Sequence, residues 1–274
     1  MPDTTDPFRL LLHPLRLRVL EVRHVERPTP KVARVTLTGA ALDGFITLSP
    51  EDHVKVFFPR DGETDPVMPV LGPNGLQPPP ARSRKPIGRD FTPRSYHAAR
   101  HELVLEFFLH GRGPASRWAA QASPGQRLGV AGPRGSRVLE AARDWHLLIG
   151  DETAQPEIAR RLEELPEGVP AIAVLEIAHV SERRELTARP GQTIHWVESP
   201  ADTRSATGPL LAAVTALELP AGCGQVWAAG EVEEVRAIYG HFVHARGLPQ
   251  EQIHVSGHWR RGVANHDHHV PIES

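Results

Sequence analysis

Hydrophobic and polar residues alternate along the first half of the chain, from Arg16 to about Val138. In the stretch KVARVTLTG, Val35 and Leu37 alternate with polar neighbours, and ELVLEFFLH repeats the pattern. Side chains of a β-strand point to alternate faces, so this pattern predicts strands with one buried face. The stretches RVLEVRHVER, DHVKVFFP, RSYHA and QRLGVA are further candidates, and such closely spaced short strands predict a small antiparallel barrel. The proline-rich segment at residues 66–86 is predicted to be a loop.

After Asp144 the pattern changes to uninterrupted hydrophobic runs, WHLLIG, PAIAVLEIA and QVWAAG, separated by segments with helical periodicity. Runs of this kind are typical of parallel strands that are buried on both faces. Helices are predicted over residues 154–165, 208–219 and 232–245. The division of the chain that we predict is a tail at residues 1–15, the barrel at 16–138, an open parallel α/β domain at 139–262 and a histidine-rich tail at 263–274.

Composition narrows the partners that the protein can have. The 274 residues suit two domains, and 33 acidic residues nearly balance 31 Lys and Arg, so we expect neither nucleic acid nor a membrane as a partner. A single cysteine, Cys223, excludes a disulfide framework and a cysteine-ligated iron–sulfur cluster. The N-terminus has acids and prolines where a signal peptide needs a basic start and an apolar core, so we expect a cytoplasmic protein.

The stretch FTPRSYHAAR places an aromatic ring between two arginines. A strand ending Arg94, Ser95, Tyr96 would present the ring and a guanidinium on the same side. A flavin nucleotide needs both, because its isoalloxazine lies against an aromatic face and its diphosphate needs fixed donors. The alternative is that Tyr96 belongs to the core and the arginines are solvated.

The next segment, HGRGPASRWAA, has the composition of an anion-binding site at a helix N-terminus. Gly111 and Gly113 lead into Pro114, a favoured first helical residue, and Ser116 lies in the first turn beside free backbone amides. The alternative is an ordinary capped helix whose Trp118 packs in the core.

In the second half, LLIGDETAQPEIARRLEEL predicts a strand, a turn and a helix. Thr153 is placed to cap the helix and Pro156 to lie in its first turn, which leaves amides free for a phosphate or a nicotinamide. The spacing G-x-G-x-x-G is missing, so this signal for a nucleotide is weak by itself. Later, VWAAGE ends another buried strand, with Gly230 allowing close backbone approach and Glu231 beside it.

Taken in order, DHVKVFFP, RSYHAAR, HGRGPASRWA, GPRGS, LLIGDETAQPEIA, VWAAGE and SGHWRRG resemble the siderophore-interacting proteins, which are flavin-dependent ferric-siderophore reductases. The resemblance runs from about Arg18 to Gly262. It implies a ferredoxin-reductase-like architecture, a six-stranded antiparallel FAD-binding barrel followed by a domain that binds NAD(P)H. The implied FAD ligands are Arg94, Ser95, Tyr96, His97, His110, Gly111, Gly113, Pro114, Ala115 and Ser116. The residues implied to border the nicotinamide site are Asp151, Glu152, Thr153 and Ala154, and we add Gly230 and Glu231 at the same edge.

One motif departs from the family pattern Arg-x-Tyr-Thr-x-Arg. The corresponding places hold Arg94, Tyr96, His97 and Ala99, and Arg100 comes one residue late. Either His97 takes the place of the threonine near the flavin N5, or the strand shifts by one residue and turns Arg100 to the other face. We favour His97 near N5, because an imidazole can still donate a hydrogen bond, and we name Tyr96 and His97 as the candidate catalytic residues.

The resemblance predicts a cytoplasmic reductase in which NAD(P)H reduces FAD and FAD reduces the iron of a ferric siderophore, releasing ferrous iron. Lys55 matches a basic position facing the anionic siderophore, and by position we add Arg134, Arg260 and Arg261, although a solvated pair of arginines is an equal reading of WRRG. A general flavin reductase that supplies an oxygenase, or a non-enzymatic siderophore-binding accessory protein, are the alternative functions.

The sequence gives weaker signals for the choice of electron donor and for metal binding by the C-terminal tail. Ser181, Arg183 and Arg184 follow the strand PAIAVLEIA and offer groups for a 2′-phosphate, which favours NADPH over NADH, although a solvated charge run explains them as well. Ferredoxin is an alternative donor, and we expect a monomer. The tail could ligate a metal through His266, Asp267, His268 and His269, but a solvated tail is the better reading, and we predict no metal site.

Overall fold

The computed structural model describes residues 7–73, 75–77, 79, 84–200, 203–266 and 272. Its internal contacts divide the chain into two compact units. One is Phe8–Val138, and the other contains Leu139 and the described residues that follow it. In the described part of the chain, none of the helices combines the length and hydrophobicity needed to cross a bilayer.

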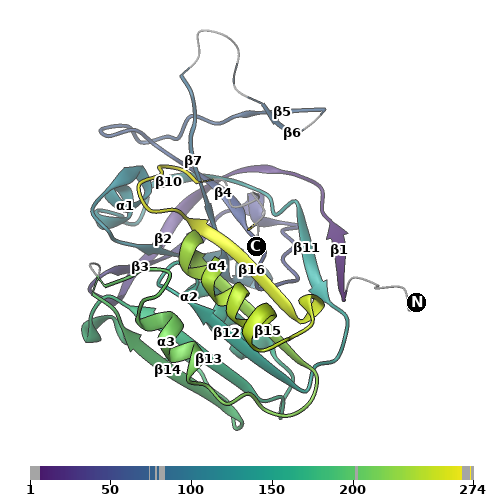
Figure 1. Ribbon diagram of the computed structural model, residues 1–274. Coiled ribbons are helices and arrows are strands. Elements are labelled where there is room, and N and C mark those ends of the chain that lie inside the picture. The colour runs from purple at the N-terminus through teal and green to yellow at the C-terminus, as the bar shows by residue number, and fades with distance from the viewer. Residues whose placement is uncertain are drawn as a thin grey trace. The chain divides into compact units, whose positions relative to one another are not determined.

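The first unit is a curled antiparallel sheet (Figure 1). Its described strands follow the order β7-β4-β10-β2-β3-β9-β8, which makes seven where the sequence predicted six. Only Thr92 separates β7 from β8, although these strands form opposite edges, so the sheet must curl until its edges meet. The bounds are β2 (Leu17–Thr29), β3 (Val32–Thr38), β4 (Val54–Phe58), β7 (Ile87–Phe91), β8 (Pro93–His97), β9 (Glu102–Phe108) and β10 (Arg127–Ala131).

The alternating positions of these strands fill the inside of the curled sheet. Val35 and Leu37 of β3 face Leu105 and Leu103 of β9 in register, and all four are fully buried. Helix α1 (Gly113–Ala120) closes this core with Trp118, whose ring centroid lies 5.6 Å from that of Phe107. Trp118 thus belongs to the core, as the alternative interpretation of this helix expected.

Smaller elements surround this sheet. Residues Phe8–Leu12, which the sequence assigned to a tail, form β1 and pair with β11 (Gly135–Leu139). The proline-rich segment contains a short hairpin of β5 (Val70–Gly72) and β6 (Gly75–Gln77). Two single 3-10 turns complete the unit, η1 (Ala40–Leu42) and η2 (Ala98–Arg100).

The second unit is a five-stranded parallel sheet in the order β14-β13-β12-β15-β16. The chain starts at the central β12, builds outward to β14, and then returns to β15 and β16 on the other side. The strand order therefore reverses between β12 and β15, and ligands of open α/β sheets bind at the carboxyl ends beside such a point. The bounds are β12 (Trp145–Gly150), β13 (Ala171–Ile177), β14 (Gln192–Glu198), β15 (Gly224–Glu231) and β16 (Ile253–Trp259).

Helices cover both faces of this sheet. Helix α2 (Gln155–Glu164) packs through Ile158 and Leu162 on one face. On the other face lie α3 (Pro209–Thr215) and α4 (Val232–Gly240), side by side in Figure 1, and α4 continues into the π-helical turn η4 (His241–Ala245). The 3-10 turns are η3 (Val180–Glu182) and η5 (Gln250–Gln252).

Candidate cofactor and substrate sites

The N-terminus of α1 is open and lacks a capping side chain. Its N-cap residue, Arg112, makes no side-chain capping hydrogen bond, and Gly111 and Gly113 have φ of 74° and 73°. The Gly111 N–H donates to the Ser116 hydroxyl oxygen at 3.1 Å, which folds the loop back, and nothing lies within 4 Å of the position of a Gly111 Cβ. Exposed amides at a helix N-terminus beside open space fit the diphosphate of FAD.

Two predicted neighbours belong to the same loop. His110 precedes the glycines, and burial, followed by the charge of Arg112, lowers the pKa of its imidazole, so the ring is neutral at physiological pH. Pro114 lies in the first turn and Ala115 packs partly against the barrel core. Both residues shape the loop and leave its amides as the polar groups.

The Tyr96 ring is held in a fixed orientation and remains half-buried. Its hydroxyl donates to the carbonyl oxygen of Leu42 at 2.9 Å, and its ring centroid lies 4.9 Å from that of Phe45. Burial, and then the charge of Asp43, raises the pKa of the phenol, so it is neutral. Tyr96 therefore packs on the core and also keeps partly exposed ring surface that can carry a flavin.

Strand β8 contains a bulge at Arg94. Pro93 pairs with Leu105 and Ser95 with Val104, so Arg94 is the extra residue of the bulge. Simple alternation does not continue across a bulge, and the predicted reason for placing Arg94 and Tyr96 on one side was therefore wrong. Beyond the bulge, Tyr96 lies opposite the buried Leu103.

His97 and Arg100 lie at the end of this strand. His97, which is exposed, lies opposite Glu102 and is the last residue of β8, so it points away from the face of Tyr96. Arg100 follows in η2, and its Nε donates to the Glu102 carboxylate at 2.7 Å. That hydrogen bond is the main cause that lowers the pKa of Glu102. Arg100 is thus engaged in a local ion pair with its neighbour.

Lys55 belongs to a cross-strand ion pair. It lies opposite Asp90 in the β4–β7 register, and its Nζ is 2.7 Å from the Asp90 Oδ2. The Lys55 side chain keeps 41% of its surface exposed. Arg134 is exposed after β10, near Gly75 of the β5–β6 hairpin, where a Cβ would lie 3.8 Å from its guanidinium carbon.

In the second unit, Asp151 follows β12 at the point where the strand order reverses. It is 1% exposed, and its Oδ1 accepts hydrogen bonds from the Thr153 N–H at 2.8 Å and hydroxyl at 2.6 Å. Its Oδ2 accepts from the Trp259 indole at 2.6 Å. Gly230 has φ of 149°, and a Cβ there would lie 2.8 Å from this oxygen. The close approach predicted at Gly230 is therefore made by the Asp151 carboxylate.

The start of α2 differs from the prediction at one position. Its N-cap residue is Ala154, without a side-chain cap, and Pro156 lies in the first turn as predicted. The prediction that Thr153 caps the helix is wrong, because the N-cap position falls on Ala154. The Thr153 N–H and hydroxyl donate to Asp151 instead. The amides of this first turn accordingly have no side-chain cap.

A buried ion pair that the sequence did not reveal lies beside this turn. Arg204 donates to both oxygens of Glu152 at 2.7 and 2.6 Å, and its Nε is 3.3 Å from Glu176. Burial alone would lower the pKa of Arg204, but the hydrogen bonds and charges of these carboxylates raise it. Arg204 lies in an irregular segment without periodicity, so no sequence pattern marks it.

Glu234 in the first turn of α4 is a further buried carboxyl group at this edge. It is 3% exposed, and within the described residues its Oε1 has no hydrogen-bond partner. Burial, followed by the charges of Glu176 and Asp151, raises the pKa of Glu234 to about 8. Glu231, in contrast, accepts from the backbone of Glu233, Glu234 and Arg261. Glu234 therefore holds a proton at neutral pH, and Glu231 is a helix cap.

The remaining predicted residues lie on two exposed segments. Ser181 in η3 contacts the imidazole of His179 through its N–H at 3.1 Å and its hydroxyl at 2.9 Å. Arg183 ends η3 and is exposed, and Arg184 is half-buried.

After β16, Arg260 lies 3.0 Å from the Glu233 carboxylate, and the Arg261 guanidinium donates to the Arg204 carbonyl oxygen at 2.9 Å. Of the predicted tail ligands, Asp267, His268 and His269 lie outside the described residues.

The two units define a class of protein. The flavohem-like FAD/NAD-binding domain of a nitric oxide dioxygenase from Vibrio cholerae O1 biovar El Tor has the same fold, with a TM-score of 0.62 and 16% identity. The match covers 89% of this chain and 98% of that chain. A curled antiparallel sheet followed by a parallel α/β unit is thus the ferredoxin-reductase-like fold that the sequence predicted.

Family models give the particular family. Residues 21–137 match the siderophore-interacting FAD-binding domain, and residues 143–262 match the siderophore-interacting protein model. The NADPH-dependent ferric-chelate reductase of Escherichia coli (strain K12) is 34% identical over 251 residues, 89% of this chain and 93% of that protein. A siderophore utilization protein from T. fusca is 38% identical, with a TM-score of 0.87 over 96% of this chain and all of that one. The chain belongs to the siderophore-interacting protein family, which confirms the resemblance.

Proposed function

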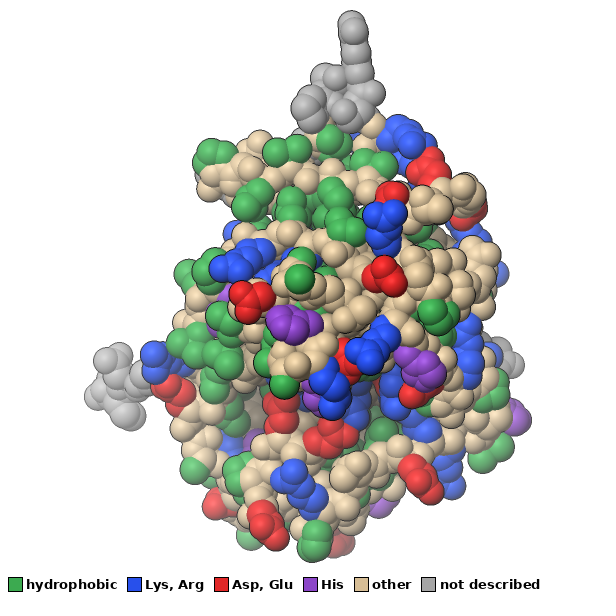
Figure 2. Space-filling view, turned by 180° about the vertical axis from the view of Figure 1, so that it is seen from behind, with side chains coloured by type: hydrophobic (Ala, Val, Ile, Leu, Met, Phe, Trp, Pro, Cys, Tyr) green, Lys and Arg blue, Asp and Glu red, His purple; other side chains and the backbone are tan. Residues whose placement is uncertain are grey.

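We propose that this protein is a cytoplasmic, monomeric ferric-siderophore reductase that uses FAD and NADPH. The observation that carries the proposal is the open, uncapped loop at the start of α1, within a matched FAD-binding domain. The name of the E. coli relative supports NADPH as donor and a ferric chelate as acceptor. Acidic and basic side chains are interspersed on the face seen in Figure 2, which favours a small substrate bound by a few local charges over an extended polyanion.

FAD, when bound, accepts a hydride from NADPH and delivers electrons one at a time. Each NADPH therefore reduces two ferric chelates and leaves NADP⁺, a proton and two ferrous ions. Hard anionic oxygen ligands hold Fe²⁺ less strongly than Fe³⁺, so reduction releases the iron.

The chain's own residues hold the reactants in this proposal. The α1 amides and Ser116 bind the diphosphate, Arg94 adds positive charge, and the Tyr96 ring supports the flavin. The imidazole of His97 points away from the Tyr96 ring, so we do not assign the predicted hydrogen bond near N5 to that side chain. These roles use groups whose positions the local fold fixes, above all the Tyr96 hydroxyl on the Leu42 carbonyl.

For the substrate, we propose that Lys55 contacts the anionic chelate and that Arg134, Arg260 and Arg261 add positive charge. Lys55 is the strongest of the four candidates, because its side chain is substantially exposed while Asp90 holds it in place. The exposed Ser181 and Arg183, with Arg184, are proposed to read the 2′-phosphate of NADPH.

Spectroscopy of the purified protein tests the proposal. The protein should be yellow, lose its flavin absorbance when NADPH is added without oxygen, and regain it on addition of a ferric siderophore, with two ferrous ions trapped per NADPH. A yellow protein that is bleached by NADPH but not reoxidised by any ferric chelate would favour the general flavin reductase. A colourless protein that takes up no FAD on reconstitution would refute the proposal.

A further inference from the structure

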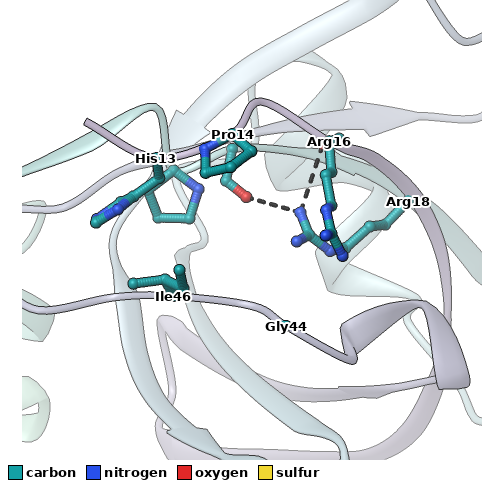
Figure 3. Close-up of a pocket in the computed structure, with 8 residues that line it drawn as sticks. His13, Pro14, Arg16, Arg18, Gly44 and Ile46 are labelled. Carbon is teal, nitrogen blue, oxygen red and sulfur yellow. Dashed lines mark hydrogen bonds between the residues drawn. The ribbon is translucent and has the colours of Figure 1, made fainter.

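A small cavity opens at the end of the curled sheet where β2 begins and β10 ends. Its volume is about 190 Å³, and its lining includes His13, Arg16, Arg18, Gly44, Ile46 and Gly132. In Figure 3 the guanidinium groups of Arg16 and Arg18 lie side by side at one end, with His13 and Ile46 at the other. All of these residues belong to the Phe8–Val138 unit.

Arg18 is a buried positive charge. It is 4% exposed, its Nε donates to the Ala41 carbonyl at 2.9 Å, and its Nη1 donates to the Gly132 carbonyl at 2.9 Å. Its guanidinium carbon lies 5.2 Å from the ring centroid of Phe45. Within the described residues, Arg18 forms no ion pair with a carboxylate. A buried charge is costly without a counter-charge, and neutral carbonyl groups compensate it only in part.

Arg16 brings a second guanidinium to the same cavity. It donates to the Asp43 carbonyl at 3.3 Å, and the position of a Gly44 Cβ lies 3.1 Å from its Nη1. Like Arg18, it has no carboxylate partner among the residues that the structure describes. The two positive charges disfavour each other, and the charge of Arg16 contributes to the lowered pKa of Arg18, after burial. An anion between them would offset both the burial of the Arg18 charge and the repulsion between the two guanidinium groups.

His13 adds a polar group with a defined tautomer. The Ser136 hydroxyl donates its only hydrogen to Asp52 at 2.7 Å, so its oxygen accepts from the Leu48 N–H and from His13 Nε2 at 2.8 Å. The His13 Nε2 therefore carries a hydrogen, and Nδ1 is the remaining polar atom of the ring. The buried Asp52 also accepts from Thr47 and from the Leu48 and Ser49 N–H groups, and it does not line the cavity.

We propose that this cavity binds a small oxyanion, a phosphate or carboxylate group, between Arg16 and Arg18. A volume of about 190 Å³ is several times the roughly 30 Å³ of a water molecule and below the roughly 300 Å³ at which sites for drug-sized ligands begin. The cavity therefore holds a small anion or one anionic arm of a larger molecule. Lys55 and Arg134 do not line it, so it is separate from the side chains proposed for the chelate. The proposal does not rest on the reductase function.

Calorimetry with inorganic phosphate and with malonate, on the FAD-loaded protein, tests this proposal. Arg16→Gln removes one charge at an exposed position and should weaken binding about tenfold, as expected for one charge-assisted hydrogen bond. Ile46→Phe keeps both arginines but fills the cavity, and should weaken binding as well. The control is Arg127→Gln, which changes an exposed arginine of β10 that pairs with Asp65. This variant should bind both anions like wild type.

Two sources of the anion can be separated by kinetics. If the cavity takes an anionic arm of the substrate, phosphate should raise KM for a ferric chelate in wild type but not in Arg16→Gln. If it takes a free oxyanion, phosphate should bind without changing KM. Absence of binding by both probes, or equal binding by wild type, Arg16→Gln and Ile46→Phe, would overturn the proposal.

Discussion

Replacing Glu234 with glutamine tests whether a buried carboxyl group holds a proton in the folded second unit. The ordinary pKa of the group is 4.5 and the folded value is about 8. The unfolded chain therefore binds fewer protons than the folded protein between these values, so the stabilising contribution is complete below pH 4.5 and is lost as pH rises through about 8. Each rise of one pH unit in this window lowers the free energy of unfolding by up to about 1.4 kcal/mol.

Over the whole interval, the free energy of unfolding can fall by at most about 5 kcal/mol. Relaxation of the surroundings reduces this loss, so we expect the free energy of unfolding to be roughly 2 kcal/mol lower at pH 8.5. Glutamine keeps the shape of the neutral carboxyl and cannot ionise. The Glu234→Gln variant should therefore be less stable than, or equal to, wild type at pH 5.5 and more stable at pH 8.5. Glu176, whose pKa is also raised, mainly by burial, leaves some pH dependence in the variant.

Urea unfolding followed by tryptophan fluorescence measures this difference, because four of the five tryptophans lie after residue 139. Glu251→Gln, an exposed glutamate at η5, is the matched control and should follow the wild-type pH dependence. Parallel stability curves for wild type and Glu234→Gln across pH 5.5 to 8.5 would show that Glu234 is ionised in the fold and that the reasoning fails.

Three further substitutions test the sites. Tyr96→Phe removes the hydrogen bond to Leu42 and should weaken FAD binding about fivefold, in line with roughly 1 kcal/mol for a neutral hydrogen bond; unchanged FAD affinity in a titration would contradict this. Lys55→Ala should raise KM for an anionic ferric siderophore at unchanged FAD content, whereas Asp90→Asn frees the ammonium and should lower KM; opposite shifts would exclude Lys55 as a substrate contact. Arg204→Met leaves Glu152 as a buried unpaired charge and should destabilise the protein by about 3–5 kcal/mol in urea unfolding, an effect that a merely exposed ion pair would not give.

Much of the fold follows from periodicity because strong burial leaves a clear pattern. The continuous runs of β12, β13 and β15 are buried on both faces and were predicted, as were the helices α2, α3 and α4. The edge strands β14 and β16 mix exposed and buried positions and were not predicted. Strand β7 was also missed, because IGRDF is neither alternating nor hydrophobic and pairs with β4, from which the proline-rich segment separates it in the sequence.

The local geometry of the sites was harder to predict, because it depends on contacts between distant segments. The bulge at Arg94 follows from the register with β9, and no property of RSYHA signals it. Thr153 is a good capping residue by type, yet the N-cap position falls on Ala154, and the Thr153 N–H and hydroxyl donate to Asp151. The Arg204–Glu152 pair joins residues 52 positions apart, and sequence reasoning without an alignment has no means to find it.

The carboxyl edge of the parallel sheet also constrains how a nucleotide can bind there. Asp151 and Glu152 are buried and have their donors within the unit, from Thr153, Trp259 and Arg204. An anionic cofactor gains nothing from such carboxylates, whereas the first-turn amides of α2 carry partial positive charge and lack a capping side chain. We therefore expect Asp151 and Glu152 to act by fixing the shape of this edge. The N–H groups of Thr153 and Ala154 both donate to Asp151, so any direct contact with the cofactor should come from the first-turn amides of α2 that follow them.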